Sequence, residues 1–338
     1  MADLSHLGTQ ILQAYQRIRP VVLETPLEPM SGLFPGNGVN LFFKMENLQH
    51  TGSFKLRGAT NKIMLLTAEQ AGKGVIAASN GNHGLGVAAA AKRTGISAEI
   101  YVSSHVSPAK AKRIEEYGAV IRRAGADPLE AELAARSAAE QAGKVFISPY
   151  NDLDVIAGQG TIAVELQRQR PGIDAIFVAV GGGGLIGGIG GYVKAASNLQ
   201  LADNQKQSQD QLQQPLQHQG SQLSMEIVGC WAENSRVLFE SLKVGRIIDF
   251  PEHPTLSEST AGGLEPGSVT LDVCKQVIDR CVLVTEDEIA AALRSVRDEK
   301  GWKIEGAAGV ALAAFLKTAD QYHGKTVVVV ICGGNTGS

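Results

Sequence analysis

The chain has 338 residues, of which 44% are hydrophobic and 19% charged, and its formal net charge at pH 7 is −3. This composition is typical of a globular protein with a sizeable core, and so small a net charge argues against a nucleic-acid or membrane partner. No apolar run reaches transmembrane length, and the four cysteines form neither a C-x-x-C pair nor a zinc pattern. We therefore expect a cytoplasmic protein without structural disulfides.

Strands and helices alternate along most of the sequence. In chain order, the apolar patterns predict the following elements: strands over 75–78 and 98–102, a helix over 107–117, a strand from 120, a helix over 129–142, and strands over 145–147, 175–180, 226–229 and 327–331. Alternation of this kind predicts an α/β fold whose sheets are doubly wound and mainly parallel. Such sheets bind ligands at the carboxyl ends of their strands.

One segment departs from this pattern. Residues 198–222 are dominated by glutamine and offer few side chains for a core. Such a composition cannot offset the entropy of ordering the chain, so we predict a mobile surface loop, within an insertion spanning 196–224. An interaction segment is the less favoured alternative.

A lysine, Lys55, follows small and hydroxyl residues and precedes a helix-like apolar pattern. At the start of a helix, the positive end of the helix dipole disfavours the ammonium form of a lysine. The neutral amine is the form that attacks an aldehyde to make a Schiff base. A surface lysine on an amphipathic helix is the alternative reading.

Two glycine-containing loops follow predicted strands and open predicted helices, one over 79–84 and the other over 181–184. This arrangement presents free backbone N–H groups to an anion. Glycine runs also occur in plain tight turns, so neither loop is decisive by itself. A nicotinamide site would want its G-x-G-x-x-G motif near the first strand.

Taken together, Lys55 and the two loops resemble the pyridoxal-phosphate (PLP) enzymes of the tryptophan-synthase fold type, called fold type II. The likeness is closest to the threonine and serine dehydratases and serine racemase, and it extends from about residue 19 to 335. It implies two doubly wound domains: a large PLP-binding domain made of 1–67 and 151–338, and a small domain made of 68–150. We also expect a homodimer.

The resemblance implies a role for individual residues. Lys55 would hold the cofactor and remove the Cα proton, the backbone of the second loop would bind the phosphate, and Cys332 would face the pyridine nitrogen as a neutral partner. The implied cofactor-binding residues are Phe54, Lys55, Asn82, Gly181, Gly182, Gly183, Gly184, Leu185, Glu305 and Cys332. The implied substrate-binding residues are Ser79, Asn80, Gly81, His83 and Tyr150.

Two departures from the racemase bear on the reaction. Asn80 stands where the racemase has a serine that protonates the opposite face of Cα, and an amide cannot act as that acid. Tyr150 stands where the racemase has an asparagine, and its ring could cover the substrate or simply be half-buried at a strand end. Racemisation is therefore disfavoured.

A third departure concerns metal. Trp231 and Val237 occupy positions at which cation-binding relatives carry acids, so Glu233 lacks a carboxylate partner. Hard cations want several oxygen ligands. We predict no magnesium site there.

The predicted function is that of a PLP-dependent dehydratase (ammonia-lyase). It would convert a β-hydroxy-α-amino acid such as L-threonine or L-serine to the 2-oxo acid and ammonia. Residues 259–267 differ from the usual threonine-dehydratase sequence and leave a bulkier 3-hydroxy amino acid open. The alternatives are an amino-acid racemase of the same fold and a non-catalytic PLP-binding protein.

Overall fold

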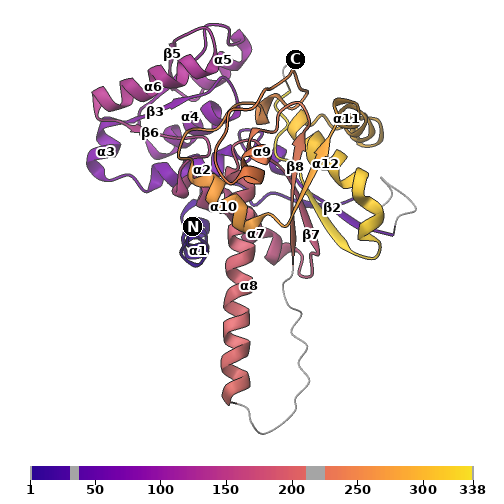
Figure 1. Cartoon of the computed structure of the whole chain (residues 1–338). Helices are drawn as coiled ribbons and strands as arrows, with labels where there is room; N and C mark the ends of the chain where they lie inside the picture. The colour runs from indigo at the N-terminus through magenta and orange to yellow at the C-terminus, as the bar shows by residue number, and fades with distance from the viewer. Residues whose placement is uncertain (1, 31–37, 211–224, 337–338) are drawn as a thin grey trace.

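The computed structural model describes residues 2–30, 38–210 and 225–336, and builds them around two sheets with helices on both faces (Figure 1). The predicted α/β class with mainly parallel sheets is confirmed. The strands are β1 (Leu27–Pro29), β2 (Asn40–Lys44), β3 (Val75–Ala78), β4 (Ala98–Val102), β5 (Val120–Arg123), β6 (Val145–Phe146), β7 (Ala175–Ala179), β8 (Glu226–Ala232), β9 (Arg280–Val284) and β10 (Thr326–Val330). The α-helices are α1 (Leu4–Ile18), α2 (Lys55–Met64), α3 (Ala68–Lys73), α4 (Asn82–Thr94), α5 (Pro108–Glu115), α6 (Pro128–Ala142), α7 (Leu153–Gln169), α8 (Gly184–Asp210), α9 (Val237–Val244), α10 (Val269–Val277), α11 (Glu286–Lys300) and α12 (Gly306–Thr318).

The larger sheet has six strands in the order β1-β2-β10-β7-β8-β9, and only its edge strand β1 is antiparallel to its neighbour. Its centre is β10, whose threonine and four valines are all buried. Strands buried on both faces read as continuous β-branched runs, which is why the sequence predicted this one. Helix α12 packs against one face, and α7 and α8 contribute to the same core.

The smaller sheet has four parallel strands in the order β5-β4-β3-β6. Helix α6 packs against β3, β4 and β6, while α4 contacts β3 and β4. All four strands lie within 75–146, inside the range predicted for the small domain. The division of the chain into two domains stays a prediction.

Helix α2, which begins at Lys55, lies between the parts of the molecule that carry the two sheets. It packs against α4 on one side and α7 on the other. The contact with α7 requires glycine, because a Cβ on Gly158 would lie 2.6 Å from the Cα of Gly58. The start of α2 is therefore fixed by close backbone packing.

The glutamine-rich segment was predicted to be a loop from residue 198, and that prediction is wrong for its first part. Helix α8 continues to Asp210 and extends beyond the sheets (Figure 1). Glutamine and alanine are good helix formers, and a helix nucleated on the core propagates at little cost. Residues 211–224 lie outside the described part of the chain.

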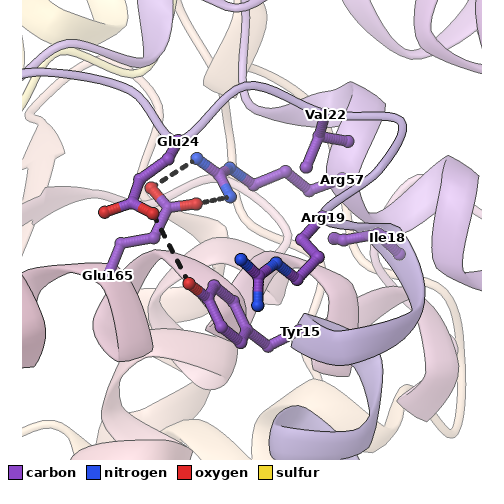
Figure 2. A pocket seen from close by; sticks show the side chains of 7 residues that line it. All are labelled: Tyr15, Ile18, Arg19, Val22, Glu24, Arg57 and Glu165. Carbon is purple, nitrogen blue, oxygen red and sulfur yellow. Dashed lines mark hydrogen bonds and ion pairs between the residues drawn. The ribbon is translucent and has the colours of Figure 1, made fainter.

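A buried network of charged side chains holds α2 in place through Arg57. The Arg57 guanidinium donates to both carboxylate oxygens of Glu46 at 2.8 Å and to those of Glu165 at 2.6 and 2.9 Å. Lys44 Nζ also contacts Glu165, at 2.6 Å. A cavity of about 220 Å³ lies beside this network (Figure 2), lined by Tyr15, Ile18, Arg19, Val22, Glu24, Arg57 and Glu165.

Within the described residues, no helix is both long and apolar enough to cross a lipid bilayer.

Candidate active site

Lys55 is the first residue of α2, as the sequence predicted, with Phe54 as the N-cap. Its Nζ donates to the carbonyl oxygen of Pro149 at 2.9 Å and lies 5.2 Å from the centroid of the Phe54 ring. Burial lowers the pKa of the amino group to about 8, against the opposing influence of Cys332 and Glu305. From the sequence we expected the helix dipole to cause this effect, but in the structure its main cause is desolvation of the buried amine. A substantial neutral fraction exists near pH 8 either way.

Cys332 lies next to the lysine loop. The Phe54 N–H donates to the Cys332 carbonyl oxygen at 3.1 Å, and Ser53 pairs with Gly333 in an isolated antiparallel bridge. The Cys332 side chain is buried, and burial raises its thiol pKa well above the ordinary value. The thiol therefore stays protonated and neutral at physiological pH.

The loop between β3 and α4 carries several of the polar residues predicted to bind substrate. The Asn80 amide is held by Ser103: its Nδ2 donates to Ser103 Oγ at 2.8 Å, and its Oδ1 accepts from the Ser103 N–H at 2.9 Å. Ser79 Oγ accepts from the Gly81 N–H at 3.1 Å. The side chain of Asn80 is thus fixed by its neighbours and carries no ionisable proton.

Asn82, the first residue of α4, is oriented by two partners. Its Nδ2 donates to the Glu305 carboxylate oxygens at 2.9 and 3.0 Å, and its Oδ1 accepts from Asn335 Nδ2 at 2.7 Å. The Asn335 backbone N–H also donates to Glu305, at 2.7 Å. Burial raises the pKa of the Glu305 carboxyl. Glu305 and Asn335 together fix which way the Asn82 amide faces.

His83 is buried one residue further along α4, with 3% of its surface exposed. Its Nε2 lies 2.8 Å from the Ile147 carbonyl oxygen, which can only accept, so this nitrogen carries the proton. Burial and the nearby Lys55 charge lower its pKa to about 3. His83 is therefore neutral at physiological pH.

The four-glycine loop joins β7 to α8, which begins at Gly184. Gly183 has a φ of +87°, and a Cβ on Gly181 would lie 2.8 Å from the Thr260 carbonyl oxygen. Tight packing thus accounts for glycine at these positions. The loop leads directly into the first turn of α8, where the first backbone N–H groups of a helix have no partners within the helix.

Tyr150 lies against this loop. A Cβ on Gly182 would collide with the Tyr150 ring, and the Tyr150 hydroxyl accepts from the Glu265 N–H at 2.9 Å. Burial raises the pKa of the phenol, so the hydroxyl stays protonated. The ring therefore lies between the glycine loop and the segment 259–267.

Comparison with known proteins identifies this arrangement. Residues 18–333 match the model of the family described as pyridoxal-phosphate dependent enzyme. The chain belongs to that family. It is a PLP-dependent lyase of the threonine-dehydratase type, as the sequence predicted, and PLP is its cofactor.

Individual relatives agree. An L-threonine ammonia-lyase of Thermotoga maritima is 37% identical over 325 residues, which cover 96% of this chain and 74% of that protein. The structure of threonine deaminase isoform 2 from Solanum lycopersicum superposes with a TM-score of 0.87 at 31% identity, covering 99% of this chain and 86% of that one. Maize serine racemase superposes with a TM-score of 0.84 at 30% identity, covering 97% and 93%.

The residues present fit PLP. The glycine loop and the first turn of α8 suit an anionic phosphate, and the buried Lys55 amine has the lowered pKa that carbonyl chemistry needs. The protonated Cys332 thiol is suited to a neutral hydrogen bond with a ring nitrogen. The role of each residue toward the cofactor stays a prediction.

Metal ligands do not converge in the described part of the chain, where no group of three His, Cys, Asp or Glu side chains is arranged to hold an ion. Trp231 and Val237, at the positions discussed above, are both buried. The predicted lack of a magnesium requirement still needs a solution test.

We expect EDTA to leave most of the activity of this PLP enzyme in place, because apolar side chains occupy the positions where cation-binding relatives carry acids. The measurement is the initial rate before and after dialysis against the chelator. A large loss that magnesium or manganese restores would contradict the prediction.

Cys332→Ser is expected to keep substantial activity, because a hydroxyl offers the same neutral hydrogen bond; a loss of about fivefold corresponds to about 1 kcal/mol. Cys332→Asp should instead favour a protonated ring and shift flux from elimination to racemisation or transamination. Both variants are assayed for 2-oxo acid and for the opposite enantiomer at saturating PLP. If the serine variant were inactive and the aspartate variant normal, the role proposed for Cys332 would be wrong.

Sequence reasoning assigned no role to several residues of this site. Asn335 and Ser103 orient Asn82 and Asn80, and the Pro149 carbonyl oxygen accepts from Lys55. Asn335 belongs to the motif that follows β10, which was a usable signal. Ser103 and Pro149 follow the strands β4 and β6, so their positions at carboxyl ends were the only hint.

Proposed function

We propose that this enzyme eliminates water from a β-hydroxy-α-amino acid such as L-threonine or L-serine and releases the 2-oxo acid and ammonia. The proposal rests most on one contrast: Lys55 has an amine with a pKa of about 8, whereas Asn80 has an amide with no ionisable proton. One group can therefore take the Cα proton from one side, and no acid stands at position 80 to return it from the other. That asymmetry favours elimination over racemisation.

When bound, PLP supplies the electron sink that makes the Cα proton of an amino acid removable. Lys55 Nζ acts as the base, and its lowered pKa keeps a usable fraction neutral near pH 8. The backbone N–H groups at the start of α4, after Ser79 and Asn80, bind the substrate carboxylate. The first turn of α8 binds the phosphate.

Two further side chains complete these roles. Cys332 would donate a neutral hydrogen bond to the ring nitrogen of bound PLP, and a neutral partner there suits loss of a β-leaving group. Tyr150 covers the glycine loop and keeps water from that side.

The names of the relatives support the substrate class. One is an L-threonine ammonia-lyase and another a threonine deaminase. The segment 259–267, which contacts Gly181 through Thr260 and Tyr150 through Glu265, would shape the space for the β-substituent. Its sequence keeps a bulkier 3-hydroxy amino acid among the candidates.

The test is a screen of serine, threonine, 3-hydroxyaspartate and 3-phenylserine, each in both stereochemical series. Release of 2-oxo acid and ammonia is measured in parallel with formation of the opposite enantiomer. We expect 2-oxo acid to form faster than the enantiomer for at least one L-substrate. Faster enantiomer formation would identify a racemase, and PLP binding without turnover of any amino acid would identify a binding protein.

The homodimer and the cytoplasmic location also stay predictions. Light scattering of the holoenzyme tests the first and fractionation of the source cells the second.

A further inference from the structure

We infer that Glu265 is a positioning residue, which ties helix α6 of the smaller sheet to Tyr150 and thereby sets the affinity for the amino acid. The inference rests on the proposed function in one respect, namely that Tyr150 covers the substrate. We call the contacts between Arg136, Glu265 and Tyr150 the clasp.

Glu265 contacts the 148–151 segment through both its backbone and its side chain. Its N–H donates to the Tyr150 hydroxyl at 2.9 Å. Its carboxylate accepts from Asn151 Nδ2 at 2.9 Å and from Ser148 Oγ at 3.5 Å. A displacement of Glu265 would therefore disturb the hydrogen bond that holds the Tyr150 side chain in place.

The same carboxylate forms an ion pair with Arg136 on α6, at 2.7 Å. The guanidinium is already oriented, because it lies 4.3 Å above the centroid of the Phe146 ring and pairs with Glu132 one turn earlier on α6. Helix α6 packs on the smaller sheet, whereas Glu265 precedes α10, which packs against α8. The ion pair thus crosses between the two parts of the molecule.

The segment that carries Glu265 also reaches the glycine loop directly. The carbonyl oxygen of Thr260 lies where a Cβ on Gly181 would approach to 2.8 Å, and the Tyr150 ring covers Gly182. At its other end, the Val269 N–H donates to Asn151 Oδ1 at 2.9 Å. The segment is therefore attached at both ends around the loop predicted to hold the phosphate.

The expected effect is modest and dependent on salt. The exposed fractions of the two side chains are 37% for Arg136 and 19% for Glu265. Ion pairs of this exposure contribute little in water, so loss of the clasp should raise KM by about two- to fivefold and leave kcat within about twofold. Salt screens such a pair, so the wild-type KM should also rise between low and high ionic strength.

The experiment is a double-mutant cycle with Glu265→Gln and Arg136→Met in the holoenzyme. Glu265→Gln keeps the backbone N–H for Tyr150 and a polar group for Asn151, and removes only the charge. KM and kcat are measured at low and high salt for whichever amino acid turns over fastest. Hydrogen exchange is measured on peptides covering 148–152 and 261–270.

Glu99→Gln is the matched control. The Glu99 side chain is 19% exposed, as is that of Glu265, and it forms ion pairs with Lys144 and Arg122. Those pairs lie on the smaller sheet, and among the described residues Glu99 forms no hydrogen bond or ion pair with Tyr150 or with 259–267. The control should leave KM, its salt dependence and the exchange of both peptides unchanged.

We expect each single variant to raise KM by a similar factor, the double variant to raise it no further, and both peptides to exchange faster. The variants should also lose the salt dependence of KM. Additive effects of the two substitutions, or unchanged exchange in either single variant, would overturn the inference. Hydrogen exchange can be measured without turnover. The clasp can therefore still be tested if the proposed function proves wrong.

Discussion

Lys55→Ala is expected to abolish turnover, by at least about 10³-fold, while leaving the fold intact. The variant lacks the amine that we propose both attaches the cofactor and takes the Cα proton. The fold should survive because alanine is the best helix former and Lys55 is the first residue of α2. Among the described residues, its side chain forms one hydrogen bond, to the Pro149 carbonyl oxygen.

The measurements are the initial rate of 2-oxo acid release, the circular dichroism spectrum and PLP retention by absorbance. PLP should still bind non-covalently, since the glycine loop and the first turn of α8 are unchanged. Lys62→Ala is the control, because Lys62 lies about two turns further along α2 and forms ion pairs with Asp152 and Asp154. Retention of more than a trace of activity in Lys55→Ala without added amine would refute the assignment.

Arg57→Met is expected to destabilise the protein by about 3–5 kcal/mol, because it leaves two buried carboxylates without their guanidinium. Arg57 and Glu46 are fully buried, and Glu165 has 2% of its side chain exposed. Glu165 keeps its ion pair with Lys44, so Glu46 is the carboxylate whose electrostatic stabilisation falls most. The free energy of unfolding is measured by urea titration at constant PLP concentration.

The pH dependence of this loss has a defined sign. In the wild type, Arg57 holds the pKa of Glu46 below its ordinary value despite burial. A carboxyl with a lowered pKa adds stability above its unfolded pKa and loses it as the pH falls. Without Arg57, burial should raise that pKa, so the variant regains stability as the carboxyl becomes neutral. The difference in unfolding free energy between wild type and variant should therefore narrow from pH 8 toward pH 5.

Lys62→Met is the control for this experiment. Its ion pairs with Asp152 and Asp154 are partly exposed, so their loss should cost less than about 1 kcal/mol. The prediction would be wrong if Arg57→Met lowered the free energy of unfolding no more than Lys62→Met. It would also be wrong if the difference in unfolding free energy between wild type and Arg57→Met widened at low pH. Either result would show that the buried network is not what anchors α2.

Local pattern in the sequence determined much of this protein. Runs of buried β-branched residues predicted strands such as β10, and alternation with amphipathic segments predicted parallel sheets, because backbone geometry and burial act over a few neighbouring residues. The start of α2 at Lys55 and of α8 at Gly184 followed from the same short-range rules. The family resemblance then assigned a chemistry to these two helix starts.

Tertiary structure alone decided which distant residues meet. The chain has 34 acidic residues, and no local pattern indicates that Arg57 takes Glu46 and Glu165, or that Arg136 takes Glu265. The cause of the lowered Lys55 pKa was also a tertiary matter, since desolvation depends on what packs around the amine. The first part of the loop predicted from composition proved to be part of α8, because composition does not show where a helix ends. A helix anchored in the core can continue into a glutamine-rich sequence, because each added turn makes its own hydrogen bonds.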